Sequence, residues 1–256
     1  MSVVVVVPTY CEYENLQPLV AQIHQALPSA HVLVVDDASP DGTGDLADAL
    51  SARWEWLHVL HRRAKDGLGR AYIAGYCHAL RSFPDAEFFI QMDADLSHNP
   101  AYLPSMLEAA EDADVVVASR YVDGISIVNW SLHRLIISKL GTAYAKLVTG
   151  LPITDCTGGY KCYRAEVLRR INLPTVRANG YVFQVETSFR AWRHGFRVKD
   201  FPIIFYERRK GTSKLNVAIA FEAFRVILAL GLQRLCARGA PAARESSGSD
   251  SASSVS

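Results

Sequence analysis

Two groups of carboxylates stand directly after apolar runs of the chain. Asp36 and Asp37 follow Val32–Val35, and Asp93-Ala94-Asp95 follows Phe88–Met92. In an open parallel sheet the carboxyl ends of the strands line one crevice, so acids that are distant in sequence can meet around one ligand. One group suits a divalent cation, because Mg²⁺ takes one or two carboxylates and completes its shell with water and substrate phosphates. The other is available to bind a sugar or a base.

The elements that must position these acids are short apolar runs separated by segments with helical spacing. Leu16, Leu19 and Ile23 repeat at helical spacing between the first two runs. Strands that alternate with helices predict an α/β fold with a mostly parallel central sheet and helices on both faces. The predicted strands are Val3–Val7, His31–Val35, Leu57–Leu60, Phe88–Met92 and Val115–Ala118.

The second half of the chain departs from this alternation. A helix is predicted over Trp130–Val148, with Leu132, Ile136, Leu140, Ala143 and Leu147 on one face. Further strands are predicted near Tyr160–Tyr163 and Val198–Phe205, around a helical stretch near Glu186–His194. The direction of these later strands stays open.

Residues 217–236 form the next predicted unit, after a main domain of residues 1–216. The segment Val217–Leu232 is strongly apolar, yet it carries Glu222 and Arg225 and is shorter than the roughly 20 residues that span a bilayer. It is expected to lie in a membrane interface or to dock on a partner. Residues 237–256 are rich in Ser, Ala and Gly and are expected to be disordered.

The composition narrows the class of protein. The 27 basic and 26 acidic residues nearly cancel, which gives no reason to expect nucleic acid as a partner. Five cysteines without CxxC spacing predict neither a zinc site nor a disulfide framework. The amino terminus lacks the pattern of a signal peptide, so a cytoplasmic protein is expected.

The loops after the strands argue against two common kinds of nucleotide site, the dinucleotide-binding loop and the P-loop. Pro8-Thr9-Tyr10-Cys11-Glu12 follows the first strand in place of GxGxxG, and the chain has no GxxxxGK[ST] motif. Each acidic or glycine-rich loop alone could be a helix cap or a turn. Together, residues 8–12, Asp36-Asp37, residues 65–69 and Asp93–Asp95 follow four successive strands, and Arg120 follows the fifth. They are therefore expected to face one crevice.

The motifs in these loops resemble glycosyltransferase family two, and within it the polyprenol-phosphate mannose synthases, also called dolichol-phosphate mannosyltransferases. The resemblance extends from Val3 to about Leu232. It rests on seven stretches in that family's order: VVVPTYCEYEN, VVDDASPDGT, KDGLGRAY, MDADLSHNP, ASRYVDG, TDCTGGYKCYR and FYERRKGTSKL.

The resemblance implies a GT-A type nucleotide-sugar fold, a GDP-mannose donor, a polyprenyl phosphate acceptor and Mg²⁺ or Mn²⁺. Asp95 would bind the metal, with Asp93 as a second candidate ligand. Ser97 stands where family members often have Gln, which leaves the third protein ligand open, and Asp66 departs from the family's KLGLG. The residues expected to bind the nucleotide-sugar are Pro8, Tyr10, Glu12, Asp37, Lys65, Gly69, Asp93, Ala94 and Asp95.

The chemistry of a phosphate acceptor argues against a dedicated catalytic base. A phosphate monoester has a second pKa near 6 and is already largely dianionic at pH 7. Cations are needed instead, to hold two phosphates together. The cations proposed for this role are Arg120, Arg134, Arg208 and Lys214, with Ser138 one helical turn after Arg134; the expected catalytic set is Asp93, Asp95, Arg120, Arg134 and Arg208.

The leading hypothesis is thus an inverting mannosyltransferase that works at the cytoplasmic face of a membrane, where a membrane-anchoring protein could assist it. Basic residues before the apolar 217–232 segment suit anionic headgroups. Two alternatives stay open: the same fold with another donor such as UDP-glucose, and a non-catalytic membrane-bound nucleotide-sugar binder. A phosphatase is disfavoured, because phosphatases that use a DxD motif place it after the first strand and not after the fourth.

Overall fold

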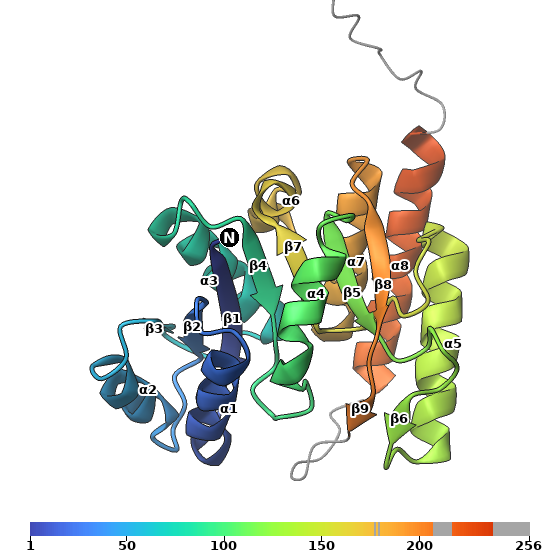
Figure 1. Cartoon of the computed structure of the whole chain (residues 1–256). Helices are drawn as coiled ribbons and strands as arrows, with labels where there is room; N and C mark the ends of the chain where they lie inside the picture. The colour runs from blue at the N-terminus through green and yellow to red at the C-terminus, as the bar shows by residue number, and fades with distance from the viewer. Residues whose placement is uncertain (177, 179, 207–216, 238–256) are drawn as a thin grey trace, which may run out of the picture.

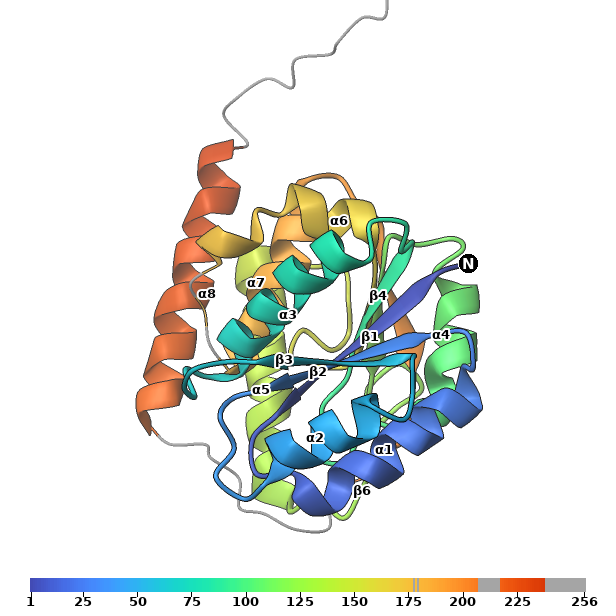
Figure 2. The same ribbon diagram turned by 90° about the vertical axis from the view of Figure 1, so that its left-hand side faces the viewer.

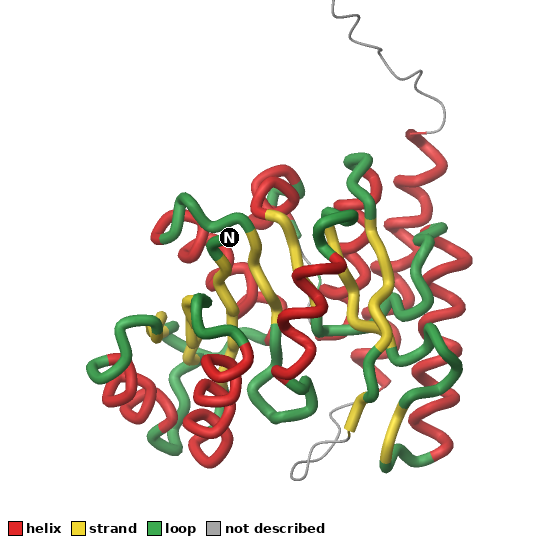
Figure 3. The backbone as a smooth tube through the Cα atoms, viewed as in Figure 1, coloured by secondary structure: helices red, strands yellow, loops and turns green. Residues whose placement is uncertain are grey.

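The computed structural model of the chain describes residues 1–176, 178, 180–206 and 217–237, with the backbone alone at 181, 217–222 and 235–237. A seven-stranded sheet runs through the centre and helices cover both of its faces (Figures 1 and 3). The predicted α/β class is confirmed.

The sheet has the strand order β3-β2-β1-β4-β7-β5-β8. The strands pair in parallel except β7, which runs antiparallel to both β4 and β5. One edge of the sheet therefore collects the carboxyl ends of six strands and the amino end of β7. The bounds are β1 Val3–Thr9, β2 His31–Asp36, β3 Leu57–His61, β4 Phe88–Gln91, β5 Val115–Ser119, β7 Lys161–Arg164 and β8 Val198–Pro202.

Alternate residues of each strand enter different core clusters, as the two-residue period of a strand requires. In β1, Val4 and Val6 face one cluster, whereas Val3, Val5 and Val7 face the other. Figure 2, which views the sheet from its β3 side, shows the helices on the two faces. The first cluster includes residues of α3 (Leu68–Ser82), α6 (Ala165–Arg170) and α7 (Gly180–Arg193), and the second those of α1 (Tyr13–Ala26), α2 (Thr43–Ser51) and α4 (Leu103–Ala109).

Helices α5 (Leu132–Thr149) and α8 (Val217–Ala237) lie side by side at the β8 end of the molecule (Figure 1). The rings of Tyr144 and Phe224 stack with centroids 5.1 Å apart, and the Tyr144 hydroxyl donates to the Phe224 carbonyl at 3.2 Å. Arg193 of α7 donates to the Gln233 carbonyl at 2.6 Å, which ties α8 to the core. Among the described helices, none combines the length and hydropathy that crossing a bilayer needs.

Two predicted elements have different limits in the structure. Helix α7 begins at Gly180, before the predicted Glu186. The predicted strand Val198–Phe205 is split: β8 ends at Pro202, and Phe205 belongs to a second, short strand. Two short strands, β6 (Ile127–Val128) and β9 (Phe205–Tyr206), pair in a separate sheet, and two short 3-10 helices span Pro100–Tyr102 and Leu173–Thr175.

Candidate functional site

The loops after β1, β2 and β4 open at the same edge of the sheet and carry unusual backbone conformations. Cys11, Ala38 and Leu96 have left-handed φ angles of 60°, 54° and 61°, one in each loop. A non-glycine residue in this region costs about 1 kcal/mol or more and tends to occur at functional sites. The strain therefore concentrates where the sequence predicts the site.

The two acids at the carboxyl end of β2, Asp36 and Asp37, have different roles. Asp36 is buried and accepts from the Thr9 hydroxyl at 3.2 Å and from the Ser39 hydroxyl at 2.6 Å. The Cys11 N–H donates to Ser39 Oγ at 3.1 Å, so Asp36 and Ser39 fasten the loop after β1 to the loop after β2. Asp37 instead forms an ion pair with Arg62, which follows β3. Burial raises the pKa of Asp37, although the Arg62 guanidinium acts in the opposite direction.

The loop after β1 presents the other residues predicted to bind the nucleoside. Tyr10 is exposed, and the Lys65 ammonium lies 3.5 Å from the centroid of its ring. Glu12 accepts from the Asn15 amide at 2.7 Å, whereas Pro8 is buried as part of β1. The structure therefore brings Tyr10 and Lys65 together. The Tyr10 ring, next to the loop that carries Asp37, is a suitable surface for a nucleotide base to stack on.

Asp93 follows β4 and is held from two sides. The Tyr72 hydroxyl of α3 donates to Asp93 Oδ1 at 2.7 Å, and the Asp93 N–H donates to His98 Nδ1 at 3.0 Å. Helix α3 can approach the sheet closely enough because Gly75 has no side chain: a Cβ there would lie 2.6 Å from Val6 Cγ1. The Tyr72 hydroxyl has a pKa well above its usual value because it is buried and faces Asp93, so it stays protonated and donates.

Asp95 lies in the same loop, and its carboxylate carries two hard oxygen atoms. Its Oδ1 accepts from the Ser97 N–H at 3.1 Å and from the Ser97 hydroxyl at 2.6 Å, which fixes the carboxylate in a tight turn. Carboxylate oxygens fit Mg²⁺ or Mn²⁺. Within the described part of the chain, no three His, Cys, Asp or Glu side chains gather as a complete metal site. The residues present therefore fit a cation that takes most of its ligands from substrate phosphates and water.

Arg120, at the end of β5, forms a buried ion pair that the sequence did not predict. Its Nε donates to Asp155 Oδ2 at 2.6 Å and its Nη2 donates to Asp155 Oδ1 at 2.8 Å and to the Thr157 hydroxyl at 2.8 Å. The Asp155 side chain is fully buried and that of Arg120 is 10% exposed. The guanidinium also lies between 5.1 and 5.7 Å from the ring centroids of Tyr121, Trp130 and Phe205. Arg120 is thus rigidly placed.

The start of α5 holds the other two described residues that were predicted to bind the acceptor phosphate. The Arg134 guanidinium lies 4.3 Å from the centroid of the Trp130 ring, and the Tyr121 hydroxyl donates to Ser138 Oγ at 2.8 Å. The cluster of Arg120, Arg134 and Ser138 is therefore joined through Tyr121 and Trp130. Tyr121 and Trp130 belong to the candidate site, and sequence reasoning did not identify them.

The remaining predicted residues are less informative. Arg208 and Lys214 lie outside the described residues. Ala94 is buried between the two acids of the loop after β4. Gly69 is also buried, and a Cβ there would lie 2.8 Å from the Ala178 carbonyl oxygen, so close packing of α3 accounts for this glycine. Contact of Gly69 with a nucleotide stays a prediction.

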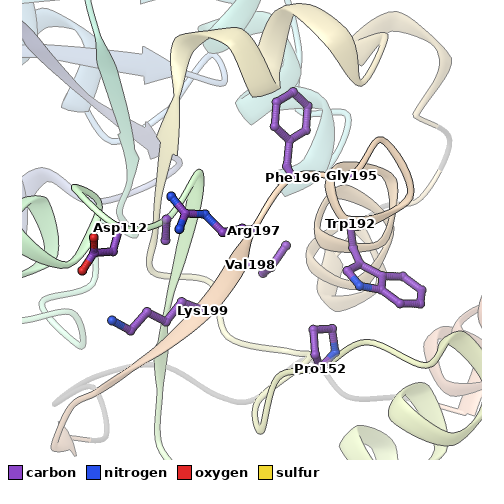
Figure 4. Close-up of a pocket in the computed structure, with 9 residues that line it drawn as sticks. Asp112, Pro152, Trp192, Gly195, Phe196, Arg197, Val198 and Lys199 are labelled. Carbon is purple, nitrogen blue, oxygen red and sulfur yellow. The ribbon is translucent and has the colours of Figure 1, made fainter. Parts of the chain in front are cut away.

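A hollow of about 430 Å³ is the cavity drawn in Figure 4. Asp112 and Arg197 in its wall precede β5 and β8, so it lies at the edge of the sheet opposite to Asp93 and Asp95. Its other labelled side chains include Trp192 of α7 and Lys199 of β8. None of the predicted site residues that the structure describes lines it, and it is not part of the candidate site.

Several solved structures share the fold of this chain. Glucosyl-3-phosphoglycerate synthase from Mycobacterium tuberculosis, solved with Mn²⁺, UDP and phosphoglyceric acid, superposes with a TM-score of 0.64 at 15% identity, over 91% of this chain and 78% of that one. A mannosyltransferase from Pyrobaculum calidifontis, solved with GDP-Man and Mn²⁺, gives a TM-score of 0.56 at 18% identity, over 92% and 74%. The fold is therefore of the GT-A type, as predicted.

Two curated proteins are similar in sequence over nearly the whole chain. An undecaprenyl-phosphate mannosyltransferase from Micrococcus luteus is 47% identical over 232 residues, which cover 91% of this chain and 95% of the relative. A polyprenol monophosphomannose synthase from Mycolicibacterium smegmatis is 44% identical over 231 residues, 90% of this chain and 86% of the relative. The pattern of glycosyl transferase family 2 matches residues 4–171, which is more than half of the sequence. The chain belongs to glycosyl transferase family 2.

Proposed function

We propose that this protein transfers mannose from GDP-mannose to a polyprenyl phosphate and releases GDP. One observation carries the proposal: Asp93 and Asp95 stand at one edge of the sheet between the nucleoside-side Asp37 and the acceptor-side Arg120. The two relatives described above, named for mannose transfer to polyprenyl phosphates, support the choice of sugar and acceptor.

The reaction needs no base to deprotonate the acceptor. A phosphate oxygen of the lipid, already negatively charged near pH 7, attacks the anomeric carbon while the bond from that carbon to the diphosphate breaks. The electron pair of the broken bond leaves with GDP, so one displacement inverts the anomeric configuration. The work of the protein is to place two anionic groups within reach of one carbon.

A divalent cation fits this arrangement. Asp95, held by Ser97, would bind Mg²⁺ or Mn²⁺ with Asp93 as a second ligand, and such a cation neutralises the charge that develops on a departing diphosphate. On the acceptor side, Arg120 and Arg134 would hold the lipid phosphate with the Ser138 hydroxyl. Arg208 and Lys214 complete the proposed set from outside the described residues.

We further propose that α5 and α8 rest on the membrane that contains the lipid acceptor, at its cytoplasmic face. Helix α5 has an unusual burial pattern: Thr142 and Thr149 are buried, whereas Leu140 is 65% and Leu147 81% exposed. A large apolar surface exposed on a monomer marks an interaction site, and a lipid acceptor makes the bilayer its natural occupant. The exposed apolar side chains of the two helices are Leu132, Ile136, Ile137, Leu140 and Leu147 of α5 and Phe224, Leu228 and Leu232 of α8.

Placing charge on this surface is expected to release the protein from membranes. The double substitution Leu140→Glu and Leu147→Glu should reduce co-flotation with vesicles that contain anionic lipid by at least about tenfold, because each leucine contributes a few kcal/mol of burial. The melting temperature should stay nearly unchanged, since both side chains are exposed. Glutamates at exposed positions of α1, Ala21→Glu and Gln22→Glu, are the control. Flotation of the α5 variant equal to that of the control would contradict the assignment and favour a docked protein partner.

The proposed function is tested by incubating the purified chain with Mg²⁺, a polyprenyl phosphate and either GDP-mannose or UDP-glucose. A mannolipid formed from GDP-mannose, with little product from UDP-glucose, is the expected result. A glucolipid would favour the alternative donor. Absence of any product, when a known mannolipid synthase is active in the same vesicles, would favour the non-catalytic binder.

A further inference from the structure

A buried hydrogen-bond network of Tyr76, Gln91 and Gln184 lies near Asp93. The Tyr76 hydroxyl of α3 donates to Gln91 Oε1 at 3.0 Å. Gln91 Nε2, at the end of β4, donates to the Gly159 carbonyl at 2.6 Å and to Gln184 Oε1 of α7 at 2.8 Å. Tyr76, Gln91 and Gln184 are each at most 2% exposed.

This network fixes which way the Gln184 amide points. A backbone carbonyl only accepts, so the Gln91 atom that faces Gly159 must be the amide nitrogen. The same nitrogen faces Gln184, whose atom on that side must therefore be the accepting Oε1. Gln184 Nε2, with its two N–H groups, is turned away from Gln91.

The backbone of Gln184 is held as firmly as its side chain. The Lys161 amine, fully buried, donates to the Gln184 carbonyl at 2.6 Å and to the Ser188 hydroxyl at 2.9 Å. Both ends of Gln184 are thus anchored by β4 and β7, the two strands that border the site. A side chain placed this firmly loses little entropy when it binds a ligand.

The outward N–H groups of Gln184 border the same space as Asp93. A Cβ built on Gly159 would lie 3.5 Å from Gln184 Nε2, 3.6 Å from His98 Cε1 and 3.7 Å from Asp93 Oδ2. These are ordinary contact distances, and Gly159 is not among the described glycines with positive φ. Neither backbone strain nor a clash therefore requires glycine here. Because Gly159 has no side chain, there is space between the Asp93 carboxylate and the Gln184 amide.

We propose that Asp93 Oδ2 and Gln184 Nε2 together bind one hydroxyl group of the hexose that is transferred. This deepens the proposed function and rests on it. It adds Gln184 and Gly159 to the site as residues that determine which sugar is accepted.

The pairing of groups selects a hydroxyl over the other oxygens of a nucleotide-sugar. A hydroxyl donates one hydrogen bond and accepts others, so it can donate to Asp93 and accept from Gln184 at the same time. A phosphate oxygen can only accept and would be repelled by the carboxylate. A site built to hydrogen-bond a substrate hydroxyl rejects analogues that lack it, because its buried polar groups are then left unpaired.

The test combines a protein variant with analogues of the donor. Affinities of GDP, GDP-mannose and GDP-mannose analogues that each lack one hexose hydroxyl are measured by calorimetry with Mn²⁺, for the unaltered chain and for Gln184→Met. One analogue should bind the unaltered chain about tenfold more weakly than GDP-mannose. Gln184→Met should bind GDP-mannose about tenfold more weakly than the unaltered chain does. It should bind GDP-mannose and the analogue without that hydroxyl with nearly equal affinity, and its affinity for GDP should be unchanged. Gln22→Met, the same change at an exposed position of α1, should change none of these affinities.

Three results would overturn the proposal. Either no analogue binds more weakly than GDP-mannose, or Gln184→Met discriminates against the analogue as well as the unaltered chain does, or GDP affinity falls as much as that of GDP-mannose. Binding of neither GDP nor GDP-mannose to the unaltered chain would instead overturn the proposed function and this inference with it.

A second variant fills the space without touching the amide network. Gly159→Ala should raise the KM for GDP-mannose about tenfold with GDP affinity unchanged, because its methyl group occupies the position of the bound hydroxyl. Gly141→Ala, whose Cβ would have no neighbour within 4 Å, is the control. An unchanged KM in Gly159→Ala would show that no substrate group enters this space.

Discussion

Replacing Asp95 by Asn is expected to lower the rate of mannose transfer about 1000-fold, the upper range for losing a group that stabilises charge in a transition state. The amide keeps the shape of the side chain but loses the charge that would attract a divalent cation. Metal-dependent binding of GDP should weaken in parallel. Initial rates at saturating Mg²⁺, with calorimetric titration of Mn²⁺ in the presence of GDP, measure both effects.

The matched control is Asp112→Asn, the same change at the exposed acid beside the cavity of Figure 4. It should leave transfer and metal binding unchanged. If Asp95→Asn transferred mannose as fast as Asp112→Asn, the assignment of Asp95 to the metal would be wrong.

Replacing Asp155 by Ala is expected to destabilise the protein by about 3–5 kcal/mol, because it leaves the Arg120 guanidinium buried without its counter-charge. In a domain of this size that corresponds to a fall in melting temperature on the order of 10 °C. Transfer should fall as well, since Asp155 and Thr157 hold Arg120 in position. Thermal unfolding and initial rates at varied acceptor concentration separate the two effects.

The double variant Asp155→Leu with Arg120→Met distinguishes a structural role from a role in the reaction. Removing both charges should recover most of the stability, as replacement of buried ion pairs by apolar residues often does. Activity should not recover, because no guanidinium is left to bind the acceptor phosphate. Recovery of full transfer in the double variant would exclude Arg120 from the acceptor site.

The same ion pair should make stability depend on acid pH. Burial alone would raise the pKa of Asp155, but the charge and hydrogen bonds of Arg120 outweigh it and hold the pKa below its usual value. A carboxyl with a depressed pKa in the folded state stabilises the protein above its unfolded pKa and loses that contribution as pH falls. The free energy of unfolding should therefore decline below about pH 4, and less so in the double variant.

The position of much of the candidate site at one edge of the sheet could be predicted, because it follows a local rule. Asp37, Lys65, Asp93, Asp95 and Arg120 each come just after an apolar run, and the carboxyl ends of parallel strands necessarily share an edge. Reading the runs as strands was enough to place these residues together. The order of the strands was not needed.

What could not be predicted depends on pairing between distant segments. β7 inserts antiparallel between β4 and β5, and only this insertion brings Asp155 to Arg120 and Gly159 to Asp93. No local pattern distinguishes an antiparallel insertion from another parallel strand. The ion pair of Asp37 with Arg62 is non-local in the same way, because it joins the ends of two neighbouring strands.

The helix after β6 illustrates another limit. Periodicity correctly grouped Leu132, Ile136, Leu140 and Leu147 on one face of α5, but a hydrophobic stripe does not reveal whether it faces the core or the outside. In the structure these four side chains are exposed. Only the tertiary arrangement shows that the described part of the chain leaves this face of α5 exposed.

We propose that the acids after β2 and β4 and the arginine after β5 surround one nucleotide-sugar. A crystal of the chain grown with Mn²⁺ and GDP-mannose tests it directly, through the anomalous scattering of manganese. We predict a manganese peak at the Asp95 carboxylate, with the guanosine toward Asp37 and the mannose between Asp93 and Arg120. Manganese bound away from Asp95, or a nucleotide on another surface of the protein, would contradict it.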